Sequence, residues 1–218
     1  IITIEDPVEY RFPGINSIQI NDKAGLTFPT SLRAVLRLDP DVVLVGEIRD
    51  AETARIAVQA ALTGHLVMSS VHANDAVRAV SRLVDLGVEP FLLSSALLGV
   101  VSQRMVRKVC DHCTVDKVPE GDEAGAATQL GFDPKNPIPM GDGCYFCGFT
   151  GYRGRTGLYE VLSASEEFRQ LVMQRASNKE LMDEARATGF RSIKEDGIDK
   201  VAAGITTPFE IMRSVYAL

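Results

Sequence analysis

The stretch PDVVLVGEIRD, residues 40–50, decides the fold class of this chain. It places four aliphatic residues, Val42 to Val45, directly before Gly46, Glu47, Arg49 and Asp50. A short apolar run of this kind, bounded by turn-forming and capping residues, is typical of a strand buried on both faces of a parallel sheet. Ligands of open parallel sheets collect at the carboxyl ends of the strands. The stretch therefore predicts a buried strand that ends at a candidate site.

Two further apolar runs resemble it, IITI at 1–4 and LVMSSV at 66–71. Helical patterns separate the three runs, at 27–38 and 51–62. Asp50 is a suitable N-cap for the second of these helices, and Gly64 is suited to its left-handed end. Strands that alternate with helices predict an α/β layer architecture.

Length and charge limit the classes of function. The chain has 218 residues, 45% of them hydrophobic, and a formal charge of −6. This composition can bury a substantial core. The charge argues against nucleic acid as a direct partner and against an anionic membrane as the main partner. The apolar segment 90–102 is too short to span a bilayer and is predicted to be a buried helix. No secretory signal is present, and the apolar start without methionine indicates a piece of a longer protein.

The last third of the chain has a different pattern. Three capping-box pairs precede helix-periodic segments: Ser163 with Glu166, Ser192 with Glu195, and Thr207 with Glu210. Such pairs mark helix starts and predict a small helical bundle. Segment 114–143 is rich in glycine, proline and acidic residues, and we expect a long surface loop or a loosely folded insert there.

Polar residues follow each predicted strand. They are Glu5, Asp6 and Glu9 after the first, Glu47, Arg49 and Asp50 after the second, and His72, Asn74 and Asp75 after the third. Carboxylates fixed at strand ends can hold a divalent cation or polarise a water molecule, and Glu47 suits this role best. The alternative is that Glu47, Arg49 and Asp50 form surface ion pairs and a helix cap.

The sequence predicts different roles for the two histidines near the third strand. His65 and His72 are an odd number of positions apart, so an extended strand turns them to opposite faces and they do not share a ligand. His72, at the far end, is the better candidate for orienting an anionic group. His65 is equally suited to a structural hydrogen bond.

All four cysteines lie in two C-x-x-C pairs, Cys110 with Cys113 and Cys144 with Cys147. Two such pairs suit a tetrahedral zinc site, and four protein ligands make the site structural. His112 could replace one thiolate as a ligand, although its place between Cys110 and Cys113 makes that geometry strained. Redox-active pairs and disulfides are the alternatives, but the lack of a secretory signal favours metal.

Four stretches in sequence order carry a resemblance: TIEDPVEY, AGLTFPTSLRAVLRLDPDVVLVGEIRDAETA, TGHLVMSSVHANDA and GYRGRTGLYEVL. They resemble the successive motifs of the bacterial secretion ATPases, which power type II secretion and type IV pilus assembly. The resemblance covers almost the whole chain. It implies an incomplete RecA-like P-loop NTPase core at 1–109, a tetracysteine zinc-binding insert at 110–150 and a C-terminal helical subdomain, a bundle, at 151–218.

The resemblance also implies residue roles. EDPVEY is similar to the acidic box, where Glu9 would orient or deprotonate the attacking water and Asp6 would bind the cofactor. VVLVGE is similar to the Walker B strand, so Glu47 would act on magnesium and water. SSVHAND resembles the histidine box, with His72 near the terminal phosphate. GYRGRTG is similar to an arginine-containing stretch near subunit contacts, although Arg153 and Arg155 could equally be solvated arginines in a glycine-rich turn.

No G-x-x-x-x-G-K-[ST] phosphate loop occurs in the sequence. By resemblance, that loop precedes the acidic box. We therefore expect this chain to bind Mg-ATP weakly or not at all, and not to hydrolyse it alone.

The full-length protein implied by the resemblance is a cytoplasmic homo-hexamer, peripheral on the bacterial inner membrane. It would use ATP and magnesium and act with an inner-membrane platform and with secretion or pilus assembly proteins. One alternative is a zinc-stabilised interaction module without catalysis. Another is a metal-dependent hydrolase that uses Glu5, Asp6, Glu9 and Glu47. The shared motifs do not separate secretion, pilus assembly and DNA uptake.

Overall fold

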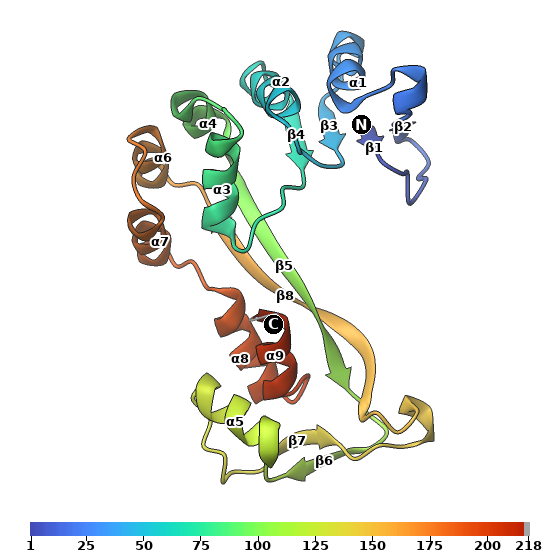
Figure 1. Ribbon diagram of the computed structural model, residues 1–218, viewed down its shortest axis with the longest axis vertical. Coiled ribbons are helices and arrows are strands. Elements are labelled where there is room, and N and C mark those ends of the chain that lie inside the picture. The colour runs from blue at the N-terminus through green and yellow to red at the C-terminus, as the bar shows by residue number, and fades with distance from the viewer. Residues whose placement is uncertain (216–218) are drawn as a thin grey trace. The chain divides into compact units, whose positions relative to one another are not determined.

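The computed structural model describes residues 1–215, which fold into two compact units (Figure 1). Unit 1 comprises Ile1–Val100 and Leu162–Gly189, and unit 2 comprises Val101–Val161 and Phe190 onward. Each unit therefore combines segments that are distant in sequence. The three-part division predicted above remains a proposal about domains.

Unit 1 is built on a parallel four-stranded sheet. Its strands are β1 (Ile2–Glu5), β2 (Asn16–Gln19), β3 (Val42–Val45) and β4 (Leu66–Ser69), in the order β2-β1-β3-β4. The three apolar runs predicted to be strands are confirmed as β1, β3 and β4. Strand β2 was not predicted, because its sequence NSIQ offers a single apolar residue to the pattern.

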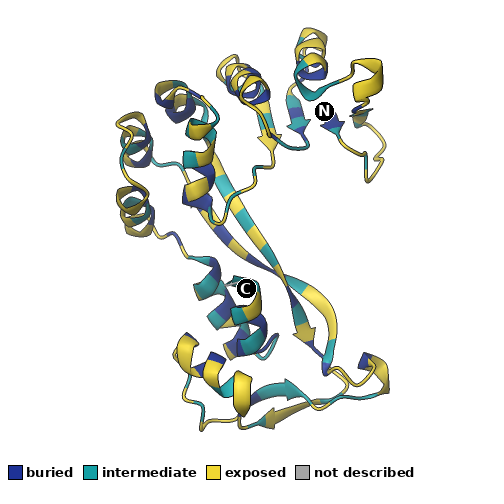
Figure 2. Ribbon diagram, in the orientation of Figure 1, coloured by how far each residue is buried: buried dark blue, intermediate teal, exposed yellow. Residues whose placement is uncertain are grey.

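The two faces of this sheet are buried to different extents. Val43 and Val45 are fully buried, whereas Val42 and Leu44, which point the other way, are only half-buried. Their cross-strand neighbours on edge strand β4, Leu66 and Met68, are exposed (Figure 2). The prediction of burial on both faces is therefore wrong for β4, because an apolar run does not reveal which strand lies at a sheet edge.

Six helices belong to unit 1: α1 (Phe28–Val35), α2 (Ala51–Leu62), α3 (Ala76–Asp85), α4 (Pro90–Ala96), α6 (Glu166–Met173) and α7 (Asn178–Ala187). The predicted cap at Asp50 is confirmed, and Gly64 beyond α2 has the left-handed φ of 103°. Helix α3 begins after Asp75, which accepts a hydrogen bond from the backbone N–H of Arg78. Short 3-10 turns occupy Asp22–Ala24 and Leu36–Leu38.

The segment 90–102, predicted to be one buried helix, contains α4 and then the start of strand β5 (Gly99–Val109). Gly99 explains part of this change. A Cβ there would lie 2.6 Å from the carbonyl oxygen of Leu162, so the two backbones approach closely. Residue Leu162 belongs to β8 (Tyr152–Ser163), which pairs with β5. Long-range pairing with β8 thus overrides the helical pattern.

Unit 2 contains the segment that was expected to be a surface loop. Residues 114–143 instead form β6 (Thr114–Lys117), α5 (Gly121–Leu130) and β7 (Ile138–Gly141), with β6 and β7 antiparallel. Helix α5 buries Ala126, Ala127 and Leu130 on one face. The prediction is wrong because the high glycine, proline and acid content masked this short apolar face.

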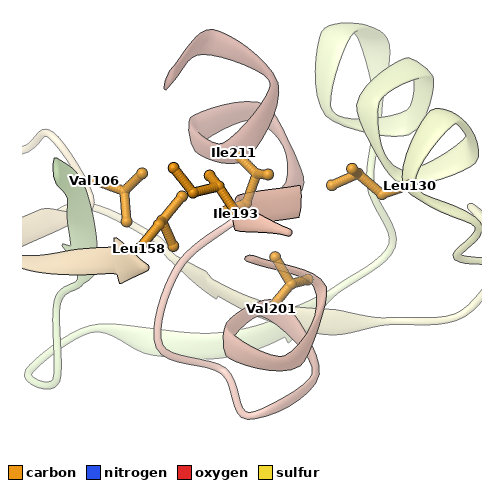
Figure 3. Close-up of a cluster of buried hydrophobic side chains, with 6 residues drawn as sticks. All are labelled: Val106, Leu130, Leu158, Ile193, Val201 and Ile211. Carbon is orange, nitrogen blue, oxygen red and sulfur yellow. The ribbon is translucent and has the colours of Figure 1, made fainter. Parts of the chain in front are cut away.

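The core of unit 2 lies between helices and strands that are far apart in sequence (Figure 3). Helices α8 (Ile193–Ala202) and α9 (Pro208–Val215) contribute part of it. Its buried residues are Val106, Leu130, Leu158, Ile193, Val201 and Ile211. The two helices pack closely, since a Cβ on Gly197 would lie 2.9 Å from Ile211 Cγ2.

The capping box at Ser192 and Glu195 is confirmed at the start of α8. Helix α6 is capped by Ser165 rather than Ser163, and a further capping box at Ser177 and Glu180 starts α7. A single bundle of the last four helices is not confirmed, because α6 and α7 belong to unit 1 and α8 and α9 to unit 2. Within residues 1–215, no helix combines the length and apolar character needed to cross a bilayer.

Candidate functional site

Glu47, Arg49 and His72 form a charged cluster beyond the carboxyl ends of β3 and β4. The Glu47 carboxylate accepts a hydrogen bond from Arg49 Nε at 2.5 Å, and the same oxygen, Oε2, lies 3.5 Å from His72 Nε2. The Glu47 side chain is only 14% exposed, whereas that of His72 is 89% exposed. A partly buried carboxylate beside an accessible imidazole can orient or deprotonate a bound water molecule. The structure thus brings two of the predicted site residues together.

Backbone contacts fix the position of Glu47. The N–H of Gly46 donates to the carbonyl of Ile4 at 2.7 Å, and the N–H of Ile48 donates to the carbonyl of Ser70 at 3.0 Å. A Cβ on Gly46 would lie 3.1 Å from the Ile4 oxygen, which explains why glycine suits this position. The carboxylate is therefore held between β1 and the chain after β4.

The surface ion pair and helix cap of the alternative interpretation are also present. Arg49 pairs with Glu47, and the hydrogen bond and charge of Glu47 raise the pKa of Arg49. Asp50 accepts bonds from the backbone N–H and hydroxyl of Thr53 at 2.8 and 2.7 Å. Burial raises the pKa of Asp50, but the bonds from Thr53 outweigh it and leave that pKa below its ordinary value. Asp50 thus acts as a cap, while Glu47 remains available to a site.

The acidic residues after β1 relate to this cluster in different ways. Glu5 accepts a hydrogen bond from Thr3 Oγ1 at 2.6 Å. Asp6 is exposed, and its negative charge helps to raise the pKa of Arg49. Glu9 is exposed, and no contact joins it to Glu47 in the part of the chain that the structure describes. Asp6 is therefore electrostatically linked to the cluster, and Glu9 stays a prediction.

His65 has a structural role. Its Nδ1 lies 3.0 Å from the carbonyl oxygen of Ala60 and 3.2 Å from Thr63 Oγ1. These contacts close the turn after α2. The separation of His65 from His72 that the strand pattern predicted is consistent with these contacts.

A pocket of about 410 Å³ extends from His72 along α3 to α7. It is lined by His72, Ala73, Asn74, Arg78, Ser81, Arg82, Asp85 and Asn178. Sequence analysis missed its arginines. The sequence does hold a signal for them: Arg78 and Arg82 are four residues apart on a helix, and this spacing places both on one helix face.

The four cysteine sulfurs of unit 2 converge. All lie within 4.8 Å of one another, and three pairs are 3.9, 3.9 and 3.8 Å apart: Cys110 with Cys144, Cys113 with Cys147, and Cys144 with Cys147. A tetrahedral zinc ion with bonds of about 2.3 Å separates its sulfur ligands by about 3.8 Å. A disulfide bond is only about 2.05 Å long. The sulfur positions therefore fit a tetrathiolate metal site.

A backbone hydrogen bond closes a tight turn within each C-x-x-C pair. The N–H of Cys113 donates to the carbonyl of Cys110 at 3.3 Å, and the N–H of Cys147 donates to that of Cys144 at 3.2 Å within the short 3-10 turn Tyr145–Cys147. Burial raises the pKa of Cys113 to about 12. Burial opposes ionisation of Cys147 too, but backbone N–H groups of Cys144 and Gly151 lower its pKa to about 6. A cation would have to displace the proton of Cys113.

Three other predicted residues belong to unit 2, namely His112, Arg153 and Arg155. His112 does not join the sulfur cluster, since its ring stacks on Phe146 at 4.2 Å and its Nε2 lies 2.6 Å from Arg153 Nη1. Arg155 is exposed. Both arginines belong to unit 2, whereas the Glu47 cluster belongs to unit 1. Their proposed place at a subunit contact stays a prediction.

Comparison with known proteins identifies the family. The sequence model of a family described as type II/IV secretion system protein matches residues 1–213. The chain belongs to this family. The motif resemblance described above is thereby confirmed.

Members of the type II/IV secretion system family include close relatives of the chain. It is 51% identical over 213 residues to the type II secretion system protein HxcR of Pseudomonas aeruginosa, covering 98% of this chain and 42% of that protein. It is 49% identical over 214 residues to the type IV pilus assembly ATPase PilB of Thermus thermophilus, covering 96% of this chain and 24% of that protein. The chain thus spans less than half the length of these relatives.

Solved structures of ATPases share the fold. The chain is similar to the pilus retraction motor PilT with bound ADP, with a TM-score of 0.69 and 27% identity, covering 98% of this chain and 51% of that one. It is also similar in fold to the ATPase DotB of Legionella pneumophila, with a TM-score of 0.64 and 21% identity, covering 96% of this chain and 49% of that one. The predicted α/β class is confirmed.

Proposed function

We propose that this chain is part of an ATPase motor that drives type II secretion or type IV pilus assembly. The observation that carries the proposal is the contact of Glu47 with His72 at the strand ends, in a family whose members include an ATPase of pilus assembly. Phosphoryl transfer asks a protein mainly to position groups and neutralise charge, and a fixed carboxylate beside an imidazole suits both tasks.

The proposal assigns a role to each residue of the cluster. Glu47 orients or deprotonates the attacking water, because it is the partly buried carboxylate in contact with His72. His72, which is exposed, contacts the terminal phosphate. Asp6 and Glu9 complete the acidic wall of the site. Magnesium, when bound, would neutralise charge on the phosphate oxygens, and Glu47 and Asp6 carry the carboxylates that suit it.

The finer assignments are also proposals. The core is RecA-like, and residues 110–150 form an insert that structural zinc stabilises through Cys110, Cys113, Cys144 and Cys147. Arg153 and Arg155 lie at subunit contacts of a homo-hexamer. The complete protein is cytoplasmic and peripheral on the inner membrane, where it acts with a membrane platform and secretion or pilus assembly proteins.

ATP hydrolysis by the complete product of the gene that encodes this chain tests the proposal. We expect Glu47→Gln to lower kcat by at least about 100-fold, as removal of a general base does. Glu52→Gln is the matched control, because Glu52 is an exposed acid that pairs with Arg33 at 2.5 Å on the same unit. If the Glu47 variant retains more than about a tenth of the wild-type rate, Glu47 is not the catalytic base.

A second candidate is a zinc-stabilised interaction module without catalysis, and the convergence of four cysteine sulfurs favours it. The two candidates differ in a simple result. A complete gene product that binds zinc tightly and shows no nucleotide hydrolysis under any condition supports the module.

A further inference from the structure

The pocket between α3 and α7 is polar and carries unused positive charge. Its volume of about 410 Å³ lies in the range of small-ligand sites, about 300–1,000 Å³, but the pocket is open to solvent rather than enclosed. Such sites are mostly apolar, but this one is lined by two arginines, two asparagines, a serine, a histidine, an aspartate and one alanine. An apolar ligand would leave these polar groups unsatisfied. The lining therefore selects a small, charged ligand.

Two arginines of α3, Arg78 and Arg82, line the pocket. Arg82 is exposed, and no hydrogen bond or ion pair involves its side chain among residues 1–215. Arg78 uses its Nε to contact Asp75 Oδ2 at 3.3 Å, so the terminal nitrogens of its guanidinium have no recorded partner within those residues. Arginine donors in a planar fork match the oxygens of a phosphate. Two such forks on one helix face suit a tetrahedral oxyanion.

Asn178 adds an amide to the pocket lining from α7. Its Oδ1 accepts the hydroxyl proton of Ser81 at 2.5 Å, which leaves the Nδ2 hydrogens as its remaining polar groups. Ser81 and Asn178 both line the pocket, from α3 and α7. This contact holds the Asn178 amide at the pocket lining, beside Ser81.

Acidic groups near the pocket limit the charge it can accept. Asp85 lines the pocket, and Asp75 already pairs with Arg78. The formal charges of these two arginines and two carboxylates balance. Within residues 1–215, Asp75 pairs with Arg78, and no ion pair is recorded for Arg82 or Asp85. This balance suits a weakly bound, exchangeable anion rather than a permanently held one.

We infer that the pocket binds inorganic phosphate through Arg82 and Arg78. The pocket begins at His72, which lies 3.5 Å from Glu47, so a phosphate released at the Glu47 cluster has an adjoining binding site. Phosphate binding itself follows from the lining. Its role as a transient site for the product of hydrolysis rests on the proposed function.

Titration of the 218-residue, zinc-loaded chain with sodium phosphate tests the inference, with sodium chloride keeping the ionic strength constant. Backbone amide NMR shifts would report the position of binding. We expect saturable shifts at residues 72–85 and 178 with a millimolar dissociation constant. Arg82→Gln should weaken phosphate binding by about threefold to tenfold, because it removes one exposed charge-assisted contact.

Arg55→Gln is the matched control, since Arg55 is an exposed arginine on α2 of the same unit and does not line the pocket. Arg78→Gln is a second pocket variant in case the first alters the fold, which unchanged amide spectra elsewhere would exclude. Shifts that do not saturate, that chloride reproduces, or that persist equally in both pocket variants overturn the inference. Saturable binding of AMP without binding of phosphate does so as well.

A second measurement separates this inference from the proposed function. The complete gene product is assayed for inhibition of ATP hydrolysis by added phosphate. We expect inhibition in the wild type and a threefold or larger rise of the inhibition constant in Arg82→Gln. If phosphate binds through Arg82 but the complete gene product does not hydrolyse ATP, the ATPase assignment fails and the phosphate site stands. If Glu47→Gln abolishes hydrolysis but phosphate does not bind, the phosphate site fails alone.

Discussion

Glu210 in unit 2 is a buried carboxylate that holds two arginines. Its side chain is 0% exposed and accepts bonds from the backbone N–H and Nη2 of Arg107 at 3.0 and 2.5 Å, and from Nε and Nη2 of Arg213 at 3.0 and 2.9 Å. Burial by itself raises the pKa of Glu210, but the bonds from both arginines outweigh it and lower that pKa to about 2. We therefore expect the ionised form of Glu210 to stabilise unit 2.

The substitution Glu210→Gln keeps the shape of the side chain and removes its charge. Breaking a buried ion pair by removing one partner costs about 3–5 kcal/mol. The Arg107 and Arg213 side chains are 41% and 53% exposed, so both cations can turn toward water after the substitution. We therefore expect a smaller loss of unfolding free energy, about 2–3 kcal/mol at neutral pH.

Urea unfolding followed by tyrosine fluorescence measures this loss. The chain has five tyrosines and no tryptophan, and Tyr145, Tyr152 and Tyr159 all belong to unit 2, so the signal reports mainly on that unit. Asp199→Asn is the matched control, because Asp199 forms an exposed ion pair with Arg191. We expect the control to change the unfolding free energy by less than about 1 kcal/mol.

The pH dependence checks the cause. The folded pKa of Glu210 is about 2, below its ordinary value of 4.5, so its stabilising contribution is fully present above pH 4.5 and is lost as the pH falls through 2. Protonated glutamate and glutamine are then similar. The difference between wild type and Glu210→Gln should shrink toward pH 2, and release of metal in acid affects both proteins alike. A difference below about 1 kcal/mol at neutral pH, or one that stays constant into acid, refutes the reasoning.

Three further predictions concern single positions. Cys113→Ser should weaken zinc binding by at least about 100-fold, measured by competition with a chelator. Loss of a residue that only hydrogen-bonds to a metal ligand already lowers affinity by about 10- to 100-fold, and loss of a ligand itself should lower it more. Unchanged affinity would contradict a four-cysteine site. Gly46→Ala should lower stability by about 1–3 kcal/mol in urea unfolding, because its Cβ would lie 3.1 Å from the Ile4 carbonyl; a neutral result would show that the strands adjust. Asp50→Ala should cost about 1 kcal/mol of stability by loss of the α2 cap, whereas Asp50→Asn should cost less, as circular dichroism during thermal unfolding would show.

Local chemistry explains which parts of the fold were predictable. The runs that became β1, β3 and β4 and the caps at Asp50 and Ser192 depend on residues within four positions of one another. Two C-x-x-C turns likewise predict a metal site from local spacing. Such signals are complete in a short stretch of sequence, so no tertiary information is needed to find them.

Errors occurred where neighbouring structure decided the outcome. The exposure of β4 depends on its place at the sheet edge, and the end of α4 depends on the pairing of β5 with β8. Helix α5 was missed because its apolar face is short and composed mostly of alanine. In each case the pattern was compatible with two structures, and packing selected one.

The sequence by itself determined the α/β class, the candidate residues Glu47 and His72, and the four cysteines of the candidate metal site. Only the tertiary structure decided that Glu47 Oε2 lies 3.5 Å from His72 Nε2 and that Arg82 and His72 line the same pocket in unit 1. It also decided that the sulfurs of Cys110 and Cys144 lie 3.9 Å apart in unit 2. The physical reason is range: hydrogen-bonded turns and side-chain periodicity act over a few residues. Contacts between distant residues form only when buried surfaces pack together and fix their separation.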